Sequence, residues 1–170
     1  TGIKWYGDEV QGNGSVTDDF YKYFGGKDMK GIDVSAHNGK IDWKTVKSDG
    51  VQFAILRAGL GKFSSQKDER FDENYTGAKA AGLPVGAYWY SYAYSVDQAE
   101  QEANACIGIL DGKTFDLPVY YDMEEDDQMA LGKQTMTAIA CRFIDTMQAA
   151  GYRGGMYSSP SWFSDFIDYD

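Results

Sequence analysis

The sequence predicts an α/β fold built on a parallel sheet, and two observations lead to that prediction. Short apolar segments alternate with segments of helical periodicity along residues 31–158, a pattern typical of strand–helix–strand units with right-handed crossovers. No Gly-x-Gly-x-x-Gly or phosphate-binding loop follows any of these strands, so a nucleotide-binding open sheet loses its main support. A (β/α) barrel of the TIM type is therefore favoured over an open doubly wound sheet.

Five segments are expected to form the strands, because each is short, mostly apolar and bounded by glycine, proline or polar residues. Residues 51–58 (VQFAILRA) are nearly all apolar, as expected for a strand that is covered on both faces. The predicted strands are residues 31–35, 51–58, 84–93, 117–122 and 153–158.

Four segments between these strands are expected to be helical. Ser95 is a suitable N-cap for one of them, and a glycine follows each of the other three. The predicted helices are residues 43–48, residues 74–81, a segment that begins after Ser95 and extends to Leu110, and residues 135–150.

The composition changes near residue 30, and this change defines the expected domain organisation. Residues 1–30 are rich in glycine and lack periodicity, so they are expected to be an N-terminal linker, followed by one barrel domain over residues 31–170. A complete (β/α) barrel typically needs about 250 residues, with small ones near 200. We therefore expect this barrel domain to be incomplete at its C-terminal end.

The composition also excludes several classes of function. With 16 basic and 26 acidic residues the net charge is −10, which disfavours binding to nucleic acid or to an anionic membrane. No apolar run approaches the ~20 residues that span a bilayer. The single histidine, His37, excludes a histidine-rich metal site. Cys106 and Cys141 lack metal-ligand spacing and are expected to be either disulfide-bonded or two buried thiols. No cofactor and no resident metal is expected.

Acidic and aromatic side chains are expected to gather where the predicted strands end. In a parallel barrel the functional site lies at the carboxyl ends of the strands. Reading that position along each strand places three carboxylates and three aromatic positions around one mouth, a composition typical of a glycosidase cleft. The residues at these positions are Asp33, Ser35, Arg57, Trp89, Tyr90, Ser91, Asp122, Glu124 and Tyr157.

Asp122 and Glu124 are the most informative pair. Residues i and i+2 of a strand face the same side, about 6.6–6.8 Å apart, so both carboxyls are expected to point into one cavity. Like charges held close raise the pKa of one group, which supplies the acid and the carboxylate that glycoside hydrolysis needs. Two other interpretations stay open. Residues 122–127 form a solvated acidic loop, or they bind a divalent cation, although no Asp-x-Asp-x-Asp-Gly calcium loop is present.

Asp33 and Arg57 each have two interpretations. Asp33 ends the first predicted strand, where it either joins the carboxylates or caps the following turn. Arg57 closes an apolar strand, so it is expected to meet a carboxylate. Arg57 either orients Asp33 or Asp122 through an ion pair, or it forms a structural salt bridge.

Five motifs occur in unbroken order: GIDVS at 31–35, GKIDW at 39–43, FAILRAG at 53–59, PVGAYWYS at 84–91 and VYYDME at 119–124. Together they resemble glycoside hydrolase family 25, the lysozyme-like muramidases, over residues 29–163. This resemblance implies cleavage of the β-1,4 bond between N-acetylmuramic acid and N-acetylglucosamine in peptidoglycan. By it Glu124 is the general acid, Asp122 its partner carboxylate and Asp33 a further essential acid, on a covalent, substrate-assisted or inverting path.

The resemblance also implies an irregular (β/α) barrel of the (β/α)5(β)3 type, whose last three strands have no counterpart in this sequence. About five β/α units are then present, and their unpaired edges favour association with another chain. The competing chitinase pattern, Asp-x-x-Asp-x-Asp-x-Glu, is not met, because Tyr120 stands two residues before Asp122.

Two hypotheses for function follow: a peptidoglycan hydrolase, or a non-catalytic glycan-binding module on the same scaffold. The intact carboxylate pair favours the enzyme, with cell-wall peptidoglycan as its expected partner. We expect a secreted, wall-associated or phage lysis protein, and the absence of a signal-peptide pattern at Thr1 fits a processed product. The expected substrate contacts are Ser35, Arg57, Tyr88, Trp89, Tyr90 and Tyr157.

Overall fold

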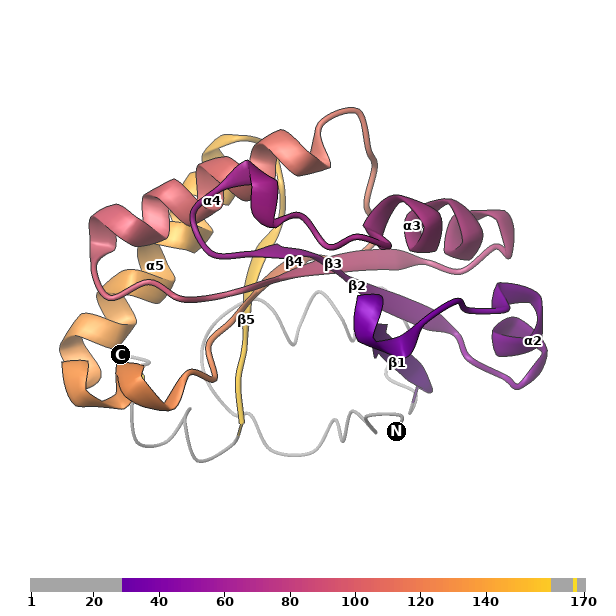
Figure 1. The fold of residues 1–170 in the computed structure, drawn as a ribbon, viewed down its shortest axis with the longest axis horizontal. Coiled ribbons are helices and arrows are strands. Elements are labelled where there is room, and N and C mark those ends of the chain that lie inside the picture. The colour runs from indigo at the N-terminus through magenta and orange to yellow at the C-terminus, as the bar shows by residue number, and fades with distance from the viewer. Residues whose placement is uncertain (1–28, 160–166, 168–170) are drawn as a thin grey trace.

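The computed structural model describes residues 29–159 and Ile167, and strands and helices alternate along this part of the chain (Figure 1). The predicted N-terminal linker lies almost entirely outside the described residues. Three short 3₁₀ segments, η1 (Ala36–Asn38), η2 (Ser64–Gln66) and η3 (Asp126–Leu131), follow the first, second and fourth strands. The main elements are β1 (Gly31–Val34), α2 (Trp43–Ser48), β2 (Phe53–Leu60), α3 (Phe71–Ala80), β3 (Val85–Tyr90), α4 (Val96–Leu110), β4 (Val119–Asp122), α5 (Lys133–Ala149) and β5 (Gly154–Tyr157).

The five strands form one parallel sheet in the order β1-β2-β3-β4-β5. The α/β class, the parallel sheet, and the number and order of the predicted strands and helices are therefore confirmed. A closed barrel is not confirmed, because β1 and β5 each pair with a single neighbour among the described residues. Closure requires hydrogen bonds on the outer edge of both strands, and the described part of the chain supplies none there.

The helices cover one face of the sheet and enclose the larger hydrophobic core (Figure 1). Alternate strand residues point to this face, including Leu56, Ala87 and Tyr121, all essentially inaccessible to solvent. The Tyr121 ring stacks on Phe143 of α5 with 3.9 Å between ring centroids. Burial of this face against the helices is therefore the main packing contact of the sheet in the described part of the chain.

Local sequence signals position the helices. Ser95 caps α4, its side chain accepting a hydrogen bond from the Gln98 N–H, as predicted. The helix α3 contains Gly77 at its contact with α2, where an added Cβ would lie 2.2 Å from Cδ1 of Trp43. Glycine at this position therefore allows the Trp43 indole to pack directly on the α3 backbone.

The opposite face of the sheet carries a smaller hydrophobic cluster, made of Phe53, Ile55, Leu117 and Tyr120. Toward the carboxyl ends of the strands this face changes from apolar to polar, because Arg57 follows Ile55 and Asp122 follows Tyr120 two residues on. The small cluster forms an apolar base, and the candidate site residues lie beyond it on the same face.

Three expectations from the sequence need correction. The strand predicted over 84–93 ends at Tyr90, because the N–H groups of Tyr92 and Ala93 bond to the side chains of Glu102 and Ser91 and not to a neighbouring strand. Cys106 and Cys141 are both free, so the disulfide alternative is wrong. Only Cys106 is a buried thiol, since Cys141 lies on the exposed side of α5.

Candidate active site

Three carboxylates meet at the carboxyl ends of β1 and β4. Asp33 lies on β1, Asp122 is the last residue of β4, and Glu124 follows two residues later. Each of the other two carboxylates raises the pKa of Asp122, and Asp33 also raises the pKa of Glu124. The structure thus brings together the three acids that the sequence singled out.

Burial raises the pKa of all three carboxyl groups. Asp122 is only 6% exposed, and its Oδ1 has no hydrogen-bond partner among the described residues. Burial, reinforced by the charges of Glu124 and Asp33, raises the pKa of Asp122 to about 8. Burial also raises the pKa of the half-buried Glu124 and of Asp33. These raised pKa values favour retention of a proton in the cluster near neutral pH.

Arg57 is paired with Asp68, a residue that no sequence pattern singles out. The Arg57 Nε lies 2.8 Å from Oδ2 of Asp68, whose side chain is fully buried. Asp68 also accepts hydrogen bonds from the backbone N–H groups of Ala36 and Arg70. The structural salt bridge is therefore the correct interpretation for the direct partner of Arg57. Its positive charge still reaches the site, since Arg57 lowers the pKa of Asp122 against the effect of burial.

Three tyrosines stand beside the carboxylates. Burial raises the pKa of Tyr88, and Asp33 and Asp122 raise it further, while Arg57 and a hydrogen bond with Ser35 lower it. Burial raises the pKa of Tyr157 to about 12, with Glu124, Asp122 and Asp33 adding to the rise. The pKa of Tyr90 is raised by burial and by Glu125, Asp122 and Glu124. All three phenols therefore stay protonated at neutral pH.

Trp89 lies on the other face of the sheet. Its side chain is inaccessible to solvent and its Nε1 donates to the Gly61 carbonyl oxygen at 2.9 Å. Because side chains alternate along a strand, Trp89 must point away from its neighbours Tyr88 and Tyr90 and into the helix-covered core. The structure therefore removes Trp89 from the candidate substrate contacts.

Ser91 belongs to a buried polar network that sequence reasoning did not find. The Ser91 hydroxyl donates to the Tyr121 hydroxyl at 2.9 Å, and Tyr121 donates to Glu102 at 2.7 Å. Gln128 of η3 donates to Ser91 and to the Ala93 carbonyl. Since the Ser91 N–H also bonds the Asp122 carbonyl, the network ties the segments after β3 and β4 together. Glu102 could have been noticed as an acid at an apolar position of its helix.

The remaining acidic residues after β4 behave differently. Asp126 and Asp127 are exposed at the start of η3, so the acidic run divides into a site-facing part and a solvated part. Among the described residues no group of three His, Cys, Asp or Glu side chains is placed to hold a metal ion. His37 is exposed in η1.

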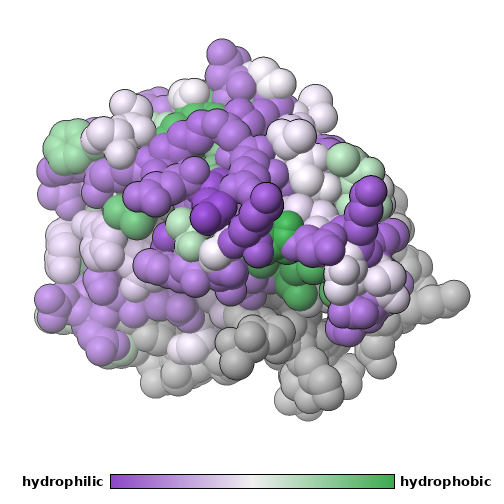
Figure 2. Space-filling view, turned by 45° about the vertical axis from the view of Figure 1, so that its right-hand side comes forward, coloured by the Kyte–Doolittle hydropathy of each residue, from purple (hydrophilic) through white to green (hydrophobic). Residues whose placement is uncertain are grey.

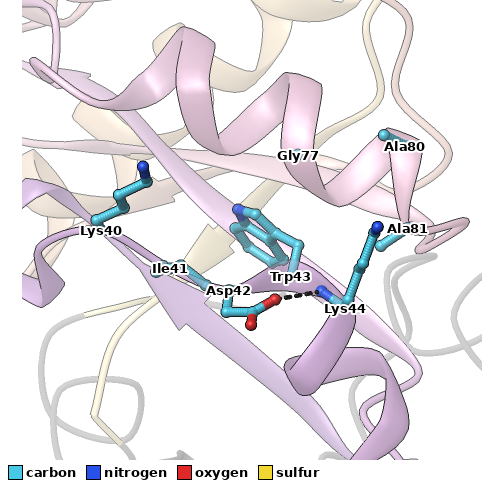
Figure 3. A pocket seen from close by; sticks show the side chains of 8 residues that line it. All are labelled: Lys40, Ile41, Asp42, Trp43, Lys44, Gly77, Ala80 and Ala81. Atoms are coloured by element: carbon cyan, nitrogen blue, oxygen red, sulfur yellow. Dashed lines mark hydrogen bonds between the residues drawn. The ribbon is translucent and has the colours of Figure 1, made fainter.

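A separate hollow of about 560 Å³ lies between α3 and the segment that leads into α2 (Figure 3). Its only carboxylate is Asp42, which caps α2 by accepting hydrogen bonds from the Lys44 and Thr45 N–H groups. This hollow lies on the helix-covered side and offers no acid pair, so it is not the candidate active site. The face seen in Figure 2 is largely hydrophilic, with small and separate hydrophobic areas.

A parallel α/β sheet with clustered carboxylates at the carboxyl ends of its strands is the arrangement of many glycoside hydrolases. The family model for glycosyl hydrolases family 25 matches residues 32–170, and the chain belongs to this family. The resemblance inferred from the motifs is therefore confirmed. No helix in the described part of the chain has the length and apolar character to cross a bilayer.

Individual relatives agree with the family. The chain is 46% identical over 63 residues to lysozyme M1 of Streptomyces globisporus, covering 37% of this chain and 21% of the relative. It is 27% identical over 142 residues to the autolytic lysozyme of Clostridium acetobutylicum, and the match covers 82% of this chain and 41% of the relative. The chain thus spans between a fifth and about two fifths of these relatives.

The fold is shared with solved structures. The modular autolysin LytC from Streptococcus pneumoniae, solved in complex with a synthetic peptidoglycan ligand, aligns with a TM-score of 0.70 and 30% identity. The alignment covers 79% of this chain and 33% of LytC.

Proposed function

We propose that this chain carries the catalytic site of a muramidase that cleaves the β-1,4 bond between N-acetylmuramic acid and N-acetylglucosamine in peptidoglycan. The observation that supports this most directly is the convergence of Asp33, Asp122 and Glu124, with Oδ1 of Asp122 buried and unpartnered among the described residues. A buried acceptor without a donor costs free energy, and a bound sugar amide or hydroxyl would satisfy it. Membership of family 25 and the relatives described as lysozymes support the same reaction.

Glu124 is assigned the role of general acid. It is more exposed than Asp122 and can therefore reach the glycosidic oxygen, while burial and Asp33 raise its pKa and favour the protonated form. Burial raises the pKa of Asp122 to about 8, so the two groups share a proton near neutral pH, and the reactive form is the one in which that proton lies on Glu124 and Asp122 is ionised. Covalent, substrate-assisted and inverting paths all require that the leaving oxygen be protonated, and this step is what we assign to Glu124.

Asp122 and Asp33 act on the other side of the reaction. A carboxylate close to the anomeric centre stabilises the positive charge that develops on the sugar. Arg57 counters the effect of burial on Asp122 and so increases the fraction of its ionised form. Asp68 is the positioning residue for the Arg57 charge, because its own fully buried carboxylate binds the Arg57 Nε at 2.8 Å.

The side chains that would bind the sugars are Ser35, Arg57, Tyr88, Tyr90 and Tyr157. Tyrosine rings offer flat apolar faces to the C–H groups of a pyranose, and their hydroxyls offer hydrogen bonds. We propose further that the parallel sheet is part of an irregular (β/α)5(β)3 barrel and that the protein acts on the cell wall from outside the cell or during phage lysis. The wall-acting relatives support that location.

The test compares Glu124→Gln with the unaltered protein on purified peptidoglycan. We expect release of reducing ends to fall at least about a thousandfold, since the variant cannot protonate the leaving oxygen. Glu69→Gln is the matched control, because Glu69 is exposed before α3 and lies outside the carboxylate cluster. Equal hydrolysis by wild type and Glu124→Gln would exclude the assignment. Binding of wall fragments by wild type without any hydrolysis would favour the non-catalytic module.

A further inference from the structure

A second hollow, of about 290 Å³, lies between the segment that joins β2 to η2 and the segment that joins β3 to α4. Three aromatic side chains line it: Phe63, Tyr92 and Tyr94, which are 58%, 43% and 42% exposed. They are the only large hydrophobic side chains that are exposed among the described residues. Three exposed rings that line one hollow indicate a binding surface more strongly than exposed hydrophobic residues scattered singly.

Polar side chains that line the same hollow bond to the backbone N–H groups of the three aromatic residues. Oε1 of Gln66 accepts a hydrogen bond from the Phe63 N–H at 3.0 Å, and Oε1 of Gln98 accepts one from the Tyr94 N–H at 2.7 Å. The Tyr92 N–H donates to Glu102, which is itself buried in the network with Tyr121. The backbone of each aromatic residue is therefore fixed before any ligand arrives, which lowers the entropy cost of binding.

The two glutamines also have donors to offer. Their Oε1 atoms are used by the backbone, and no acceptor for either Nε2 is present in the described part of the chain. An amide N–H₂ beside an aromatic face is suited to a pyranose, whose C–H face is apolar and whose hydroxyl and N-acetyl oxygens accept hydrogen bonds. The volume is at the lower limit of the ~300–1,000 Å³ typical of small-molecule sites, so it fits a single sugar ring.

One ring contact links the hollow to the strand that borders the carboxylate site. The rings of Tyr90 and Tyr92 are in contact, with centroids 5.2 Å apart and planes inclined by 57°. Tyr90 pairs with Asp122 in the sheet register, and Tyr92 lines the hollow. A glycan strand that occupies the carboxylate site can therefore continue along Tyr90 and Tyr92 without leaving an aromatic surface.

We propose that Phe63, Tyr92, Tyr94, Gln66 and Gln98 form a remote sugar subsite. It binds an N-acetylated ring of the same glycan strand, beyond the two rings that flank the cleaved bond. The proposal rests on the proposed function, because it assumes that the glycan strand is bound for cleavage at the carboxylate site. The subsite makes the affinity of the protein depend on glycan length, because short oligosaccharides that fill the carboxylate site do not reach Phe63 and Tyr94.

The test measures binding separately from catalysis. Peptidoglycan oligosaccharides from two to eight sugars are titrated calorimetrically into Glu124→Gln, alone and combined with Phe63→Ala or Tyr94→Ala. We expect each alanine to weaken binding of the longest oligosaccharide about five- to tenfold, the loss expected for ~50 Å² of apolar contact. Tyr94→Phe keeps the ring and should bind within about twofold of its parent. Gln148→Ala, an exposed change on α5, is the surface control.

A loss confined to the longer oligosaccharides supports the subsite. Equal affinity in all variants, an equal loss at every length, or no binding of any oligosaccharide would overturn it. The proposed function fails separately, when the wild-type protein releases no reducing ends while the length-dependent binding of Glu124→Gln persists. Phe63 and Tyr94 are exposed, so their truncation leaves no cavity in the core. We therefore expect the thermal unfolding curves of the alanine variants to match the curve of their parent.

Discussion

Removal of the Asp68 charge is expected to destabilise the protein more than any comparable change to a surface acid. Asp68→Asn breaks the ion pair with Arg57 at 2.8 Å and weakens the bonds to the Ala36 and Arg70 N–H groups at 2.9 and 3.0 Å. The Arg57 side chain is only 14% exposed, so its charge would be left without a partner in a poorly solvated place. Breaking a buried pair in this way costs about 3–5 kcal/mol. Asparagine keeps the shape and some acceptors, so we expect a loss of about 3 kcal/mol.

The assay is thermal and urea unfolding of the full chain, with Asp72→Asn as control. For a chain of this size the expected loss lowers Tm by roughly 6–12 °C. Asp72 also pairs with lysines, but its side chain is 60% exposed. Exposed pairs contribute less than about 1 kcal/mol. Similar stability losses for Asp68→Asn and Asp72→Asn would refute the reasoning, since it attributes the larger loss to the burial of Asp68 and to its backbone hydrogen bonds.

Two further outcomes follow from the structure. The pKa of Asp122 is raised by burial from its ordinary value to about 8, so its favourable contribution is complete at low pH and is lost as pH rises toward 8. Asp122→Asn should therefore gain stability relative to wild type between pH 4 and 8 in urea unfolding, and a difference that does not change with pH would contradict this. Gly77→Ala should destabilise by about 1–3 kcal/mol, because the new Cβ collides with Trp43. Gly108→Ala in α4 meets nothing within 4 Å and should instead stabilise by about 0.5–1 kcal/mol; equal effects in thermal unfolding would count against this packing argument.

The sequence was sufficient for the elements and for the acids. Apolar runs bounded by glycine are local patterns, and they located β1 to β5 within a few residues. Asp122 and Glu124 are two residues apart at the end of an apolar strand, so a local pattern was sufficient to select both, although β4 ends at Asp122 and Glu124 lies just beyond it.

Long-range partners were not predictable in the same way. Arg57 was expected to meet an acid, but Asp68 lies eleven residues further on in an irregular segment, with no periodic pattern to mark it. Trp89 was assigned to the mouth because it lies near the carboxyl end of its strand. Strict application of the two-residue period would have placed it correctly.

The sequence by itself determined the order of the elements, the family to which the chain belongs and the identity of the three carboxylates. These depend on short-range periodicity and on motifs that survive without any knowledge of packing. Only the tertiary structure decided the partner of Arg57, the burial of Asp122, the network around Glu102 and the hollow between Phe63 and Tyr94. Each of these arises where segments distant in the chain meet, and desolvation at such a meeting is a property of the packed sheet and helices, which no local pattern encodes.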